Sequence, residues 1–380
     1  MRKSFCLGVL LLVVFEVLNV YFIMPMPGSQ TMQSIDVAFF LYRWRWAFRV
    51  VSVVLIAIGA PAVLRKRGVG RVLAPLSIAL AGMVVYAFNF KMSADAMFLQ
   101  PTAVTMRGAD RNSVAMGRLV VGVELHGDAR AYPIQFIGYH HQVRDMVGGT
   151  PVLVTFCTVC RTGRVFAPIV DGKPESFRLV GMDHFNAMFE DNTTGSWWRQ
   201  ANGEAIAGAK TGAFLPEIPS VQVTLAQWLA LHPASLIMQP DATMADHYAT
   251  TFDYETGASR SSLTGTDSVS WRDKAWVVGL EVNRASRAYD WNRLRRERVV
   301  NDNVGGTPIV LALASDQASF FAFERPGPRV RFELKGDSLV SAGQAYALSG
   351  QGASGSLRPV FASQEFWHSW RTFHPGTTTY

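Results

Sequence analysis

Cysteine is scarce in this sequence, with three residues among 380. Cys6 lies in an apolar run, too close to the start for a usual lipoprotein signal, and we interpret it as a free thiol facing lipid. Only Cys157 and Cys160 remain. Two cysteines are too few for the disulfide framework of a small secreted domain.

Most of the chain also lacks a basic excess. Residues 101–380 contain 26 Lys and Arg against 26 Asp and Glu, so the net charge of +7 arises in residues 1–100. A nucleic-acid-binding protein carries its basic excess on the folded domain, and this distribution therefore excludes nucleic acid as a partner. The nucleophile elbow, the phosphate-binding glycine loop and the His-Glu-x-x-His zinc helix are absent as well. No catalytic or cofactor-binding residue is assigned.

Long apolar runs are confined to residues 1–100. They cover approximately Phe5–Met24, Ala47–Leu64 and Val72–Phe90, each close to the ~20 residues that a helix needs to cross a bilayer core. A cleaved signal peptide is the alternative for the first run, but Met24-Pro-Met-Pro offers no clear small-x-small cleavage site. We predict an α-helical anchor of about three transmembrane helices over 1–100.

The basic residues next to these runs predict an orientation. Arg2, Lys3 and the link 65–71 would be cytoplasmic under the positive-inside rule. The chain is then a multi-pass protein of the inner (cytoplasmic) membrane, with its C-terminal domain on the periplasmic or extracellular side. The basic cluster Arg43–Arg49 falls on the outer side, where its interleaved tryptophans suit an interfacial belt and its arginines reach headgroups.

Glu16 lies inside the first apolar run. A carboxyl group within a membrane span is by default a candidate functional group. The alternative is a protonated Glu16 that bonds a neighbouring helix or lies near the interface, and we favour this structural role.

Two parts of the remaining chain resemble each other at a constant offset of 157 residues. Val121–Tyr132 matches Val278–Tyr289, and Val143–Leu153 matches Val300–Val310. A further echo pairs Trp228-x-x-x-His232-Pro with Trp370-x-x-x-His374-Pro. We predict two tandem, diverged repeats over 113–240 and 270–380, joined by a polar linker over 241–269.

Local signals in both copies indicate strands and turns. Only Leu225–Leu231 and Phe366–Phe373 have a helical pattern. The expected architecture is therefore a mainly β extracytoplasmic domain behind the helical anchor. Features shared by both copies are best explained by their common fold, and we interpret Arg130 with Asp145, and Arg287 with Asp302, as structural pairs.

Features confined to the first copy are the candidates for function. Cys157-Thr-Val-Cys160 follows a buried strand, whereas the second copy has no cysteine. Two cysteines separated by two residues at a strand end can point both sulfurs the same way. The proposed metal or redox site consists of Cys157, Cys160, His141, His184 and Met188, surrounded by His140, Asp183, Asn186 and Trp198.

Three functions compete for this site. Thiolate, imidazole and thioether ligands suit copper, and histidines with thiolates suit zinc, so the first is soft-metal binding for metal handling or electron transfer. The second is a dithiol/disulfide redox enzyme, which a non-cytoplasmic compartment permits. The third is a binding module in which the cysteines form a structural disulfide. The expected partners are the lipid bilayer and, for the binding module, another membrane protein.

Several motifs resemble a known family. Thr155–Gly163, Asn186-x-Met188 and Gly195–Gln200 resemble the uncharacterised prokaryotic family catalogued as domain of unknown function 3179. Arg130–Pro133 and the Gly-Gly-Thr-Pro turn that ends at Pro151 fit the same pattern.

Members of that family are typically exported or membrane-anchored, and no activity is implied by the resemblance. It does imply that Cys157, Cys160, Asn186 and Met188 are important. The family often has a His-Glu step where this chain has His141-Gln142, which favours His141 over His140 as the participant.

Overall fold

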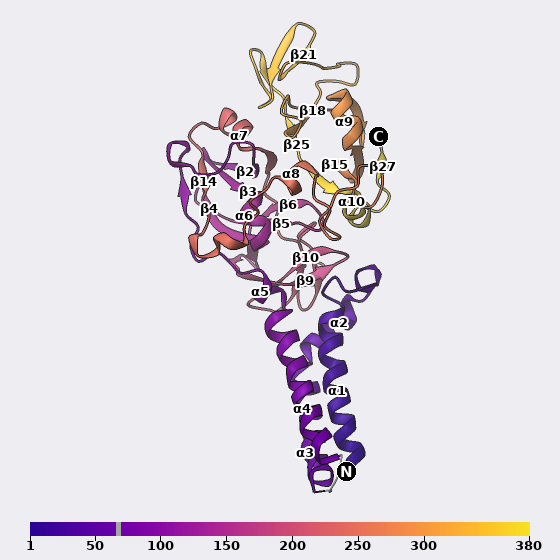
Figure 1. The fold of residues 1–380 in the computed structure, drawn as a ribbon. Helices are drawn as coiled ribbons and strands as arrows, with labels where there is room; N and C mark the ends of the chain where they lie inside the picture. Colours follow the sequence, from indigo (N-terminus) through magenta and orange to yellow (C-terminus); the bar gives the residue numbers. More distant parts are fainter. Residues whose placement is uncertain (66–69) are drawn as a thin grey trace. The chain divides into compact units, whose positions relative to one another are not determined.

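The computed structural model describes residues 1–65 and 70–380, and Figure 1 shows the order of the elements. Lys66 and Arg67 of the predicted cytoplasmic link lie outside the described residues. Contacts divide the chain into two units. The first comprises 1–99, 176–199 and 204–213, and the second comprises 100–175, 200–203 and 214–380.

The first unit contains three helices that are long and apolar enough to cross a membrane. They are α1 (Arg2–Tyr21), α3 (Arg45–Leu64) and the helix Arg71–Lys91, in which α4 (Gly70–Tyr86) ends in a π-helical turn, Ala87–Lys91. The predicted apolar helices are confirmed to within a few residues. Of the shorter helices, α2 (Ile35–Arg43) lies between α1 and α3, and α5 (Ala94–Met97) follows the third long helix.

Glu16 of α1 is fully buried and bonds to two neighbouring helices. Its carboxylate accepts hydrogen bonds from Arg49 Nε at 2.7 Å and from Asn89 Nδ2 at 2.8 Å. The predicted bond to a neighbouring helix is therefore confirmed. The prediction that Arg49 reaches toward headgroups is wrong, because its guanidinium is paired with Glu16 inside the helix bundle.

A four-stranded antiparallel sheet completes the first unit. Its order is β12-β11-β10-β9, with β9 (Phe177–Asp183), β10 (Asn186–Asp191), β11 (Trp197–Arg199) and β12 (Ala205–Ala207). Met182 N donates to the carbonyl oxygen of Ile23 at 2.7 Å. The segment after α1 therefore lies against the edge strand β9.

The second unit is built mainly of β-strands (Figure 1). The same order of elements occurs twice in it. The first series is β2 (Leu119–Leu125), β3 (Asp128–Pro133), α6 (Ile134–His140), β4 (Gln142–Val147), β5 (Thr150–Cys157) and β6 (Thr162–Phe166). The second is β15 (Trp276–Val282), β16 (Ala285–Asp290), α9 (Trp291–Glu297), β17 (Val299–Val304), β18 (Thr307–Leu313) and β19 (Phe320–Glu324).

Later elements of each series complete corresponding sheets. In the first, β13 (Val221–Thr224) pairs antiparallel with β2, and β14 (Leu236–Met238) pairs parallel with β3. In the second, β26 (Ala362–Phe366) pairs antiparallel with β15, and β27 (Thr378–Thr379) pairs parallel with β16. The registers agree too, since Gly122 lies opposite Ala131 and Gly279 lies opposite Ala288.

The remaining strands extend this framework. The edge strand β1 (Met106–Arg107) pairs with β14, β25 (Pro359–Val360) pairs with β19, and β7 (Ile169–Val170) pairs with β8 (Lys173–Pro174). A separate antiparallel sheet contains β20 (Glu333–Lys335), β21 (Ser338–Ser341), β22 (Gln344–Ala347), β23 (Gln351–Gly352) and β24 (Gly355–Ser356).

Two helices explain why glycine occupies the matching strand positions. The predicted helices are confirmed as α7 (Leu225–Leu231) and α10 (Trp367–Phe373). A Cβ on Gly122 would lie 2.4 Å from the Trp228 ring of α7, and one on Gly279 would lie 2.1 Å from the Trp370 ring of α10. Each tryptophan packs on bare strand backbone, which a larger residue would prevent.

The expectation of only two helices in this region is wrong. The two-turn helices α6 and α9, and the one-turn helix α8 (Asp253–Thr256), are also present. The first two are seven residues long, the same length as the predicted α7 and α10. Both end in a left-handed residue, His141 at φ 62° and Arg298 at φ 59°.

The predicted structural ion pairs are confirmed. Arg130 Nη1 lies 2.8 Å from Asp145 Oδ2, and Arg287 Nε lies 2.6 Å from Asp302 Oδ2. One apolar core contains residues of both series, including Val121, Phe156, Val310 and Phe323. The two halves of this unit therefore fold around shared buried surface.

Candidate functional site

Cys157 and Cys160 lie at the end of β5, in the turn that leads into β6. Both are fully buried thiols, and no disulfide joins them in the described chain. The thiols are hydrogen-bonded to each other. The prediction that the sulfurs face the same place is therefore confirmed.

The second half of the unit covers this turn. Phe366 N donates to the Cys160 carbonyl oxygen at 2.9 Å, and His368 Nε2 lies 3.2 Å from the Val159 carbonyl oxygen. Burial raises the pKa of Cys160 well above its usual value, and the hydrogen bond with Cys157 raises it further. Cys160 is therefore a protonated, enclosed thiol at neutral pH, whereas thiol–disulfide exchange requires an accessible thiolate.

His140 and His141 lie at the end of α6, in the same unit as the cysteines, and both are buried. His140 Nε2 lies 2.8 Å from the Tyr248 hydroxyl, and His141 Nδ1 lies 3.0 Å from the Tyr139 carbonyl oxygen. Burial lowers the pKa of His141 to about 4. This imidazole is consequently neutral at physiological pH.

The other predicted site residues lie in the first unit. His184 follows β9, and its two ring nitrogens lie 2.5 Å from Asp183 Oδ1 and 3.3 Å from Gln33 Nε2. Asp183 also pairs with Arg199 at 2.6 Å. Burial raises the pKa of Asp183, but His184 and Arg199 more than offset this, so the pKa is lowered.

Three further predicted residues are buried in the sheet of the first unit. Asn186 and Met188 are fully buried on β10. Trp198 of β11 donates its indole N–H to Asp191 Oδ2 at 2.8 Å. The predicted set is thus divided between the two units. In 1–65 and 70–380, no three His, Cys, Asp or Glu side chains are grouped so that they could hold one metal ion.

Arg161 directly follows Cys160, and its environment is the most unusual at this strand end. Its side chain is 1% exposed, and its guanidinium carbon lies 3.7 Å from the centre of the Trp276 ring and 4.9 Å from that of Tyr254. Its nitrogens donate to the carbonyl oxygens of Tyr254 at 2.8 Å and Glu255 at 3.2 Å, and to Gln364 Oε1 at 2.9 Å.

All three of these acceptors are uncharged, and within the described chain Arg161 has no carboxylate at ion-pair distance. The nearby Glu255 carboxylate is instead paired with Arg118 at 3.1 Å and accepts from Leu119 N at 3.0 Å. Burial lowers the pKa of Arg161, with Tyr254 and Glu255 opposing the shift. Buried charges in proteins are normally paired, so this guanidinium lacks the counter-ion that its burial calls for.

Gln364 of β26 contributes an unused donor beside Arg161. Its side chain is 1% exposed, and its Oε1 accepts from both Arg161 and Gln222, the latter at 3.2 Å. Its Nε2 has no hydrogen-bond partner among the described residues. A buried amide N–H without an acceptor is costly, and it lies next to the uncompensated cation.

Arg161 and Gln364 line a cleft of about 440 Å³ between the two halves of the second unit, here named the Arg161 cleft. Its other cation is Arg295 of α9, which is exposed. Apolar lining is supplied by Met116, Ala226, Phe252, Trp276, Trp291 and Ala318. The remaining polar lining includes Thr224, Glu255, Thr256, Asp316 and Gln317.

The electrostatics of this cleft favour a negatively charged guest. Glu255 is paired with Arg118. Asp316 accepts from the uncharged hydroxyls of Ser319 at 2.6 Å and Thr224 at 2.9 Å and keeps its negative charge. The two lining cations, Arg161 and Arg295, therefore outnumber this one unpaired carboxylate. The donors and aromatic rings match a ligand with an acidic group and an apolar body, in a cavity of the size that small-molecule sites commonly have.

Sequence reasoning missed Arg161 as a binding residue, although it belongs to the Cys157–Gly163 motif. The available signal was a charged residue inside an otherwise apolar strand end. Gln364 carried no signal, because its position beside Arg161 depends on how the two halves pack.

The comparisons with known proteins agree with the resemblance in the motifs. The family described as protein of unknown function (DUF3179) matches residues 99–377. Neither curated proteins nor solved structures yielded a match. The chain belongs to the DUF3179 family.

Proposed function

We propose that this member of the family is a membrane-anchored, extracytoplasmic binding protein whose Arg161 cleft takes an organic anion. The single observation that carries the proposal is the buried Arg161 guanidinium without a carboxylate partner. A bound carboxylate or phosphate group would supply the missing charge and would accept from Gln364 Nε2. It would also replace the water that an open cleft admits.

The proposed location rests on the N-terminal helices and their flanking charge. Three helices of sufficient length and apolarity support a multi-pass anchor. Arg2 and Lys3 in the first turn of α1 support a cytoplasmic N-terminus, which after three crossings puts the β-rich part outside. The recurrence of strand order and register in the second unit supports an origin of its two halves by duplication.

Binding of benzoate to the detergent-solubilised full chain tests the proposal. Benzoate combines a carboxylate with a flat apolar ring, and benzamide is its uncharged counterpart. Calorimetry should show benzoate binding with an affinity at least about tenfold above that of benzamide. Equal affinities, or no benzoate binding at millimolar concentration, would contradict the proposal.

A matched pair of variants locates the site. Arg295→Gln removes the exposed cation of the cleft and should weaken benzoate binding by about tenfold. Arg296→Gln removes the next residue of α9, which is equally exposed but does not line the cleft, and should leave the affinity unchanged. Equal effects of the two substitutions would place the anion elsewhere.

Soft-metal binding is a second candidate function, favoured by the direct contact between the two thiols. Two thiolates suffice for Cu(I), which thiolate ligands select. Elemental analysis of the purified chain should then find copper or zinc in the wild type and in Cys6→Ser, but not in Cys157→Ser. The same metal content in all three proteins would remove this candidate and would leave the anion proposal untouched.

A further inference from the structure

A second cavity in the second unit, of about 480 Å³, lies around Arg164 of β6 and is here named the Arg164 cleft. Residues of β26 line both cavities. Adjacent strand residues point to opposite faces, so Gln364 lines the Arg161 cleft whereas Ser363 lines the Arg164 cleft. The two cavities are therefore separate sites on either side of the same strand.

The Arg164 cleft has an excess of negative charge. Arg164 is paired with Glu217 at 3.2 Å and with the buried Glu365 at 2.9 Å. Glu281 adds a third carboxylate, and its side chain is 56% exposed. Burial lowers the pKa of His374, so this imidazole adds no positive charge at neutral pH.

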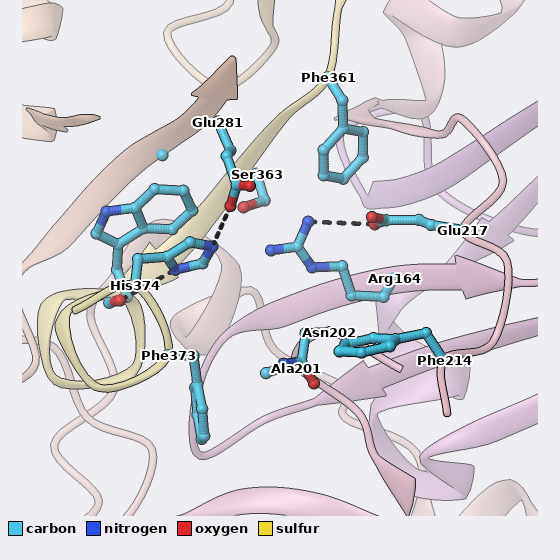
Figure 2. Close-up of a pocket in the computed structure, with 12 residues that line it drawn as sticks. Arg164, Ala201, Asn202, Phe214, Glu217, Glu281, Phe361, Ser363, Phe373 and His374 are labelled. Carbon is cyan, nitrogen blue, oxygen red and sulfur yellow. Dashed lines mark hydrogen bonds and ion pairs between the residues drawn. The ribbon is translucent and has the colours of Figure 1, made fainter. Parts of the chain in front are cut away.

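Aromatic rings form much of the remaining lining. They belong to Phe214, Phe361, Trp370 and Phe373. Phe214 is 61% exposed, which is unusual for a large apolar side chain, and Phe361 lies with its ring centre 4.9 Å from the Arg164 guanidinium carbon. Figure 2 shows the Arg164 side chain extending between Glu217 and the Glu281–His374 pair, with phenylalanine rings around it.

An unused donor indicates that a polar ligand atom belongs in this cleft. Arg164 is 5% exposed, and its Nε has no hydrogen-bond partner in the described chain. A negatively charged acceptor is disfavoured there, because two carboxylates already surround the guanidinium. An uncharged oxygen, such as a hydroxyl, ether or ester oxygen, would satisfy this N–H.

We infer that the Arg164 cleft binds a small organic ammonium compound that also carries a neutral oxygen. Carboxylates and the faces of aromatic rings together attract ammonium groups, including methylated ones that cannot donate hydrogen bonds. Glu281 and the aromatic rings hold the cation, and Arg164 Nε donates to the oxygen. This site is independent of the anion site proposed for the other face of β26.

Choline is the probe, and dimethylbutanol, its uncharged carbon analogue, is the reference ligand. Calorimetry on the full chain in detergent should show choline binding about tenfold more tightly than dimethylbutanol. Equal affinities for the two, or no heat of choline binding at ten millimolar or below (roughly the weak end of specific binding), would overturn the inference.

Glu281→Gln tests the assignment of the cation site. It keeps the size of a side chain that is 56% exposed, so it creates no cavity in the core. The substitution should weaken choline binding by about fivefold. Glu124→Gln is the matched control, because Glu124 has the corresponding position in the first half, on β2, and does not line the cleft. Equal effects of the two substitutions would overturn the assignment. Benzoate affinity should be unchanged in Glu281→Gln, so failure of one site is distinguishable from failure of the other.

Discussion

Arg161 directly precedes β6 and Arg164 lies within this strand, three residues further on. Both side chains are almost fully buried. Arg164 is held by two carboxylates, whereas Arg161 is held by two carbonyl groups, one amide and two aromatic rings. Burial lowers the pKa of both guanidinium groups. Glu217 and Glu365 more than reverse this at Arg164, so its pKa is raised, but that of Arg161 stays lowered.

The presence or absence of carboxylate partners gives the two arginines different roles: Arg164 is a structural cation, and Arg161 is a binding cation in our proposal. Arg164 completes an ion-pair network that joins the two halves of the second unit, because Glu217 follows β6 in the first half and Glu365 belongs to β26 in the second. Arg161 has the same burial without the same compensation. In our account a ligand anion provides that compensation.

The largest expected effect concerns stability. Arg164→Met leaves Glu365 buried without its cation and should lower the free energy of unfolding by about 3–5 kcal/mol. Arg161→Met removes a cation that has no counter-ion and leaves carbonyl acceptors unused, so the loss should be only about 1–2 kcal/mol. Denaturant unfolding of both variants in the absence of ligand measures the difference. A larger loss for Arg161→Met would contradict the comparison.

A second substitution gives Arg161 a carboxylate partner like those of Arg164. Gln364→Glu places a carboxylate where Gln364 Oε1 now accepts from Arg161 at 2.9 Å. The built-in counter-ion should raise the free energy of unfolding by about 1 kcal/mol and should abolish benzoate binding, as calorimetry would reveal. Glu365→Asp, which keeps the charge beside Arg164, is the control and should bind benzoate normally. Wild-type benzoate affinity in Gln364→Glu would show that Arg161 needs no anion.

The smallest expected effect is a dependence of anion binding on pH. Burial raises the pKa of Glu255, against the opposing effects of Leu119 N, Arg118 and Arg161. As the pH falls through this raised pKa, Glu255 loses its negative charge and the Arg161 cleft becomes more positive. Benzoate affinity should therefore increase severalfold, by about 1 kcal/mol or less, as the pH is lowered from neutral. Calorimetry on Glu255→Gln should show a flatter profile, and an unchanged profile would remove Glu255 as the cause.

Much of the fold follows from local sequence patterns. Apolar runs predicted the three long helices, and the strand and turn signals predicted the mainly β part of the chain. Shared residues such as Arg130 and Asp145 were correctly predicted as structural pairs. The two-turn helices α6 and α9 were missed, although α7 and α10 are equally long. α6 contains Gly138 and the β-branched Ile134 and Ile137, which have low helix propensity, and α9 has only Trp291 and Leu294 as apolar positions.

The site was less accessible to sequence reasoning, and for a physical reason. Sequence proximity predicted that Cys157 and Cys160 would meet, and they do. Sequence spacing contains no information on which residue of β26 faces Arg161, since that depends on packing between halves about 200 residues apart. The sequence also cannot show that Arg161 is buried without a carboxylate beside it, because this depends on contacts in the folded chain.

The most direct test is the unfolding temperature of the full chain in detergent as a function of benzoate concentration, for the wild type and for Arg161→Met. A ligand that binds the native state raises this temperature. We predict that benzoate raises it for the wild type, that benzamide does not, and that Arg161→Met does not respond to benzoate. An equal rise in unfolding temperature for the wild type and for Arg161→Met would contradict the claim that the bound anion pairs with Arg161.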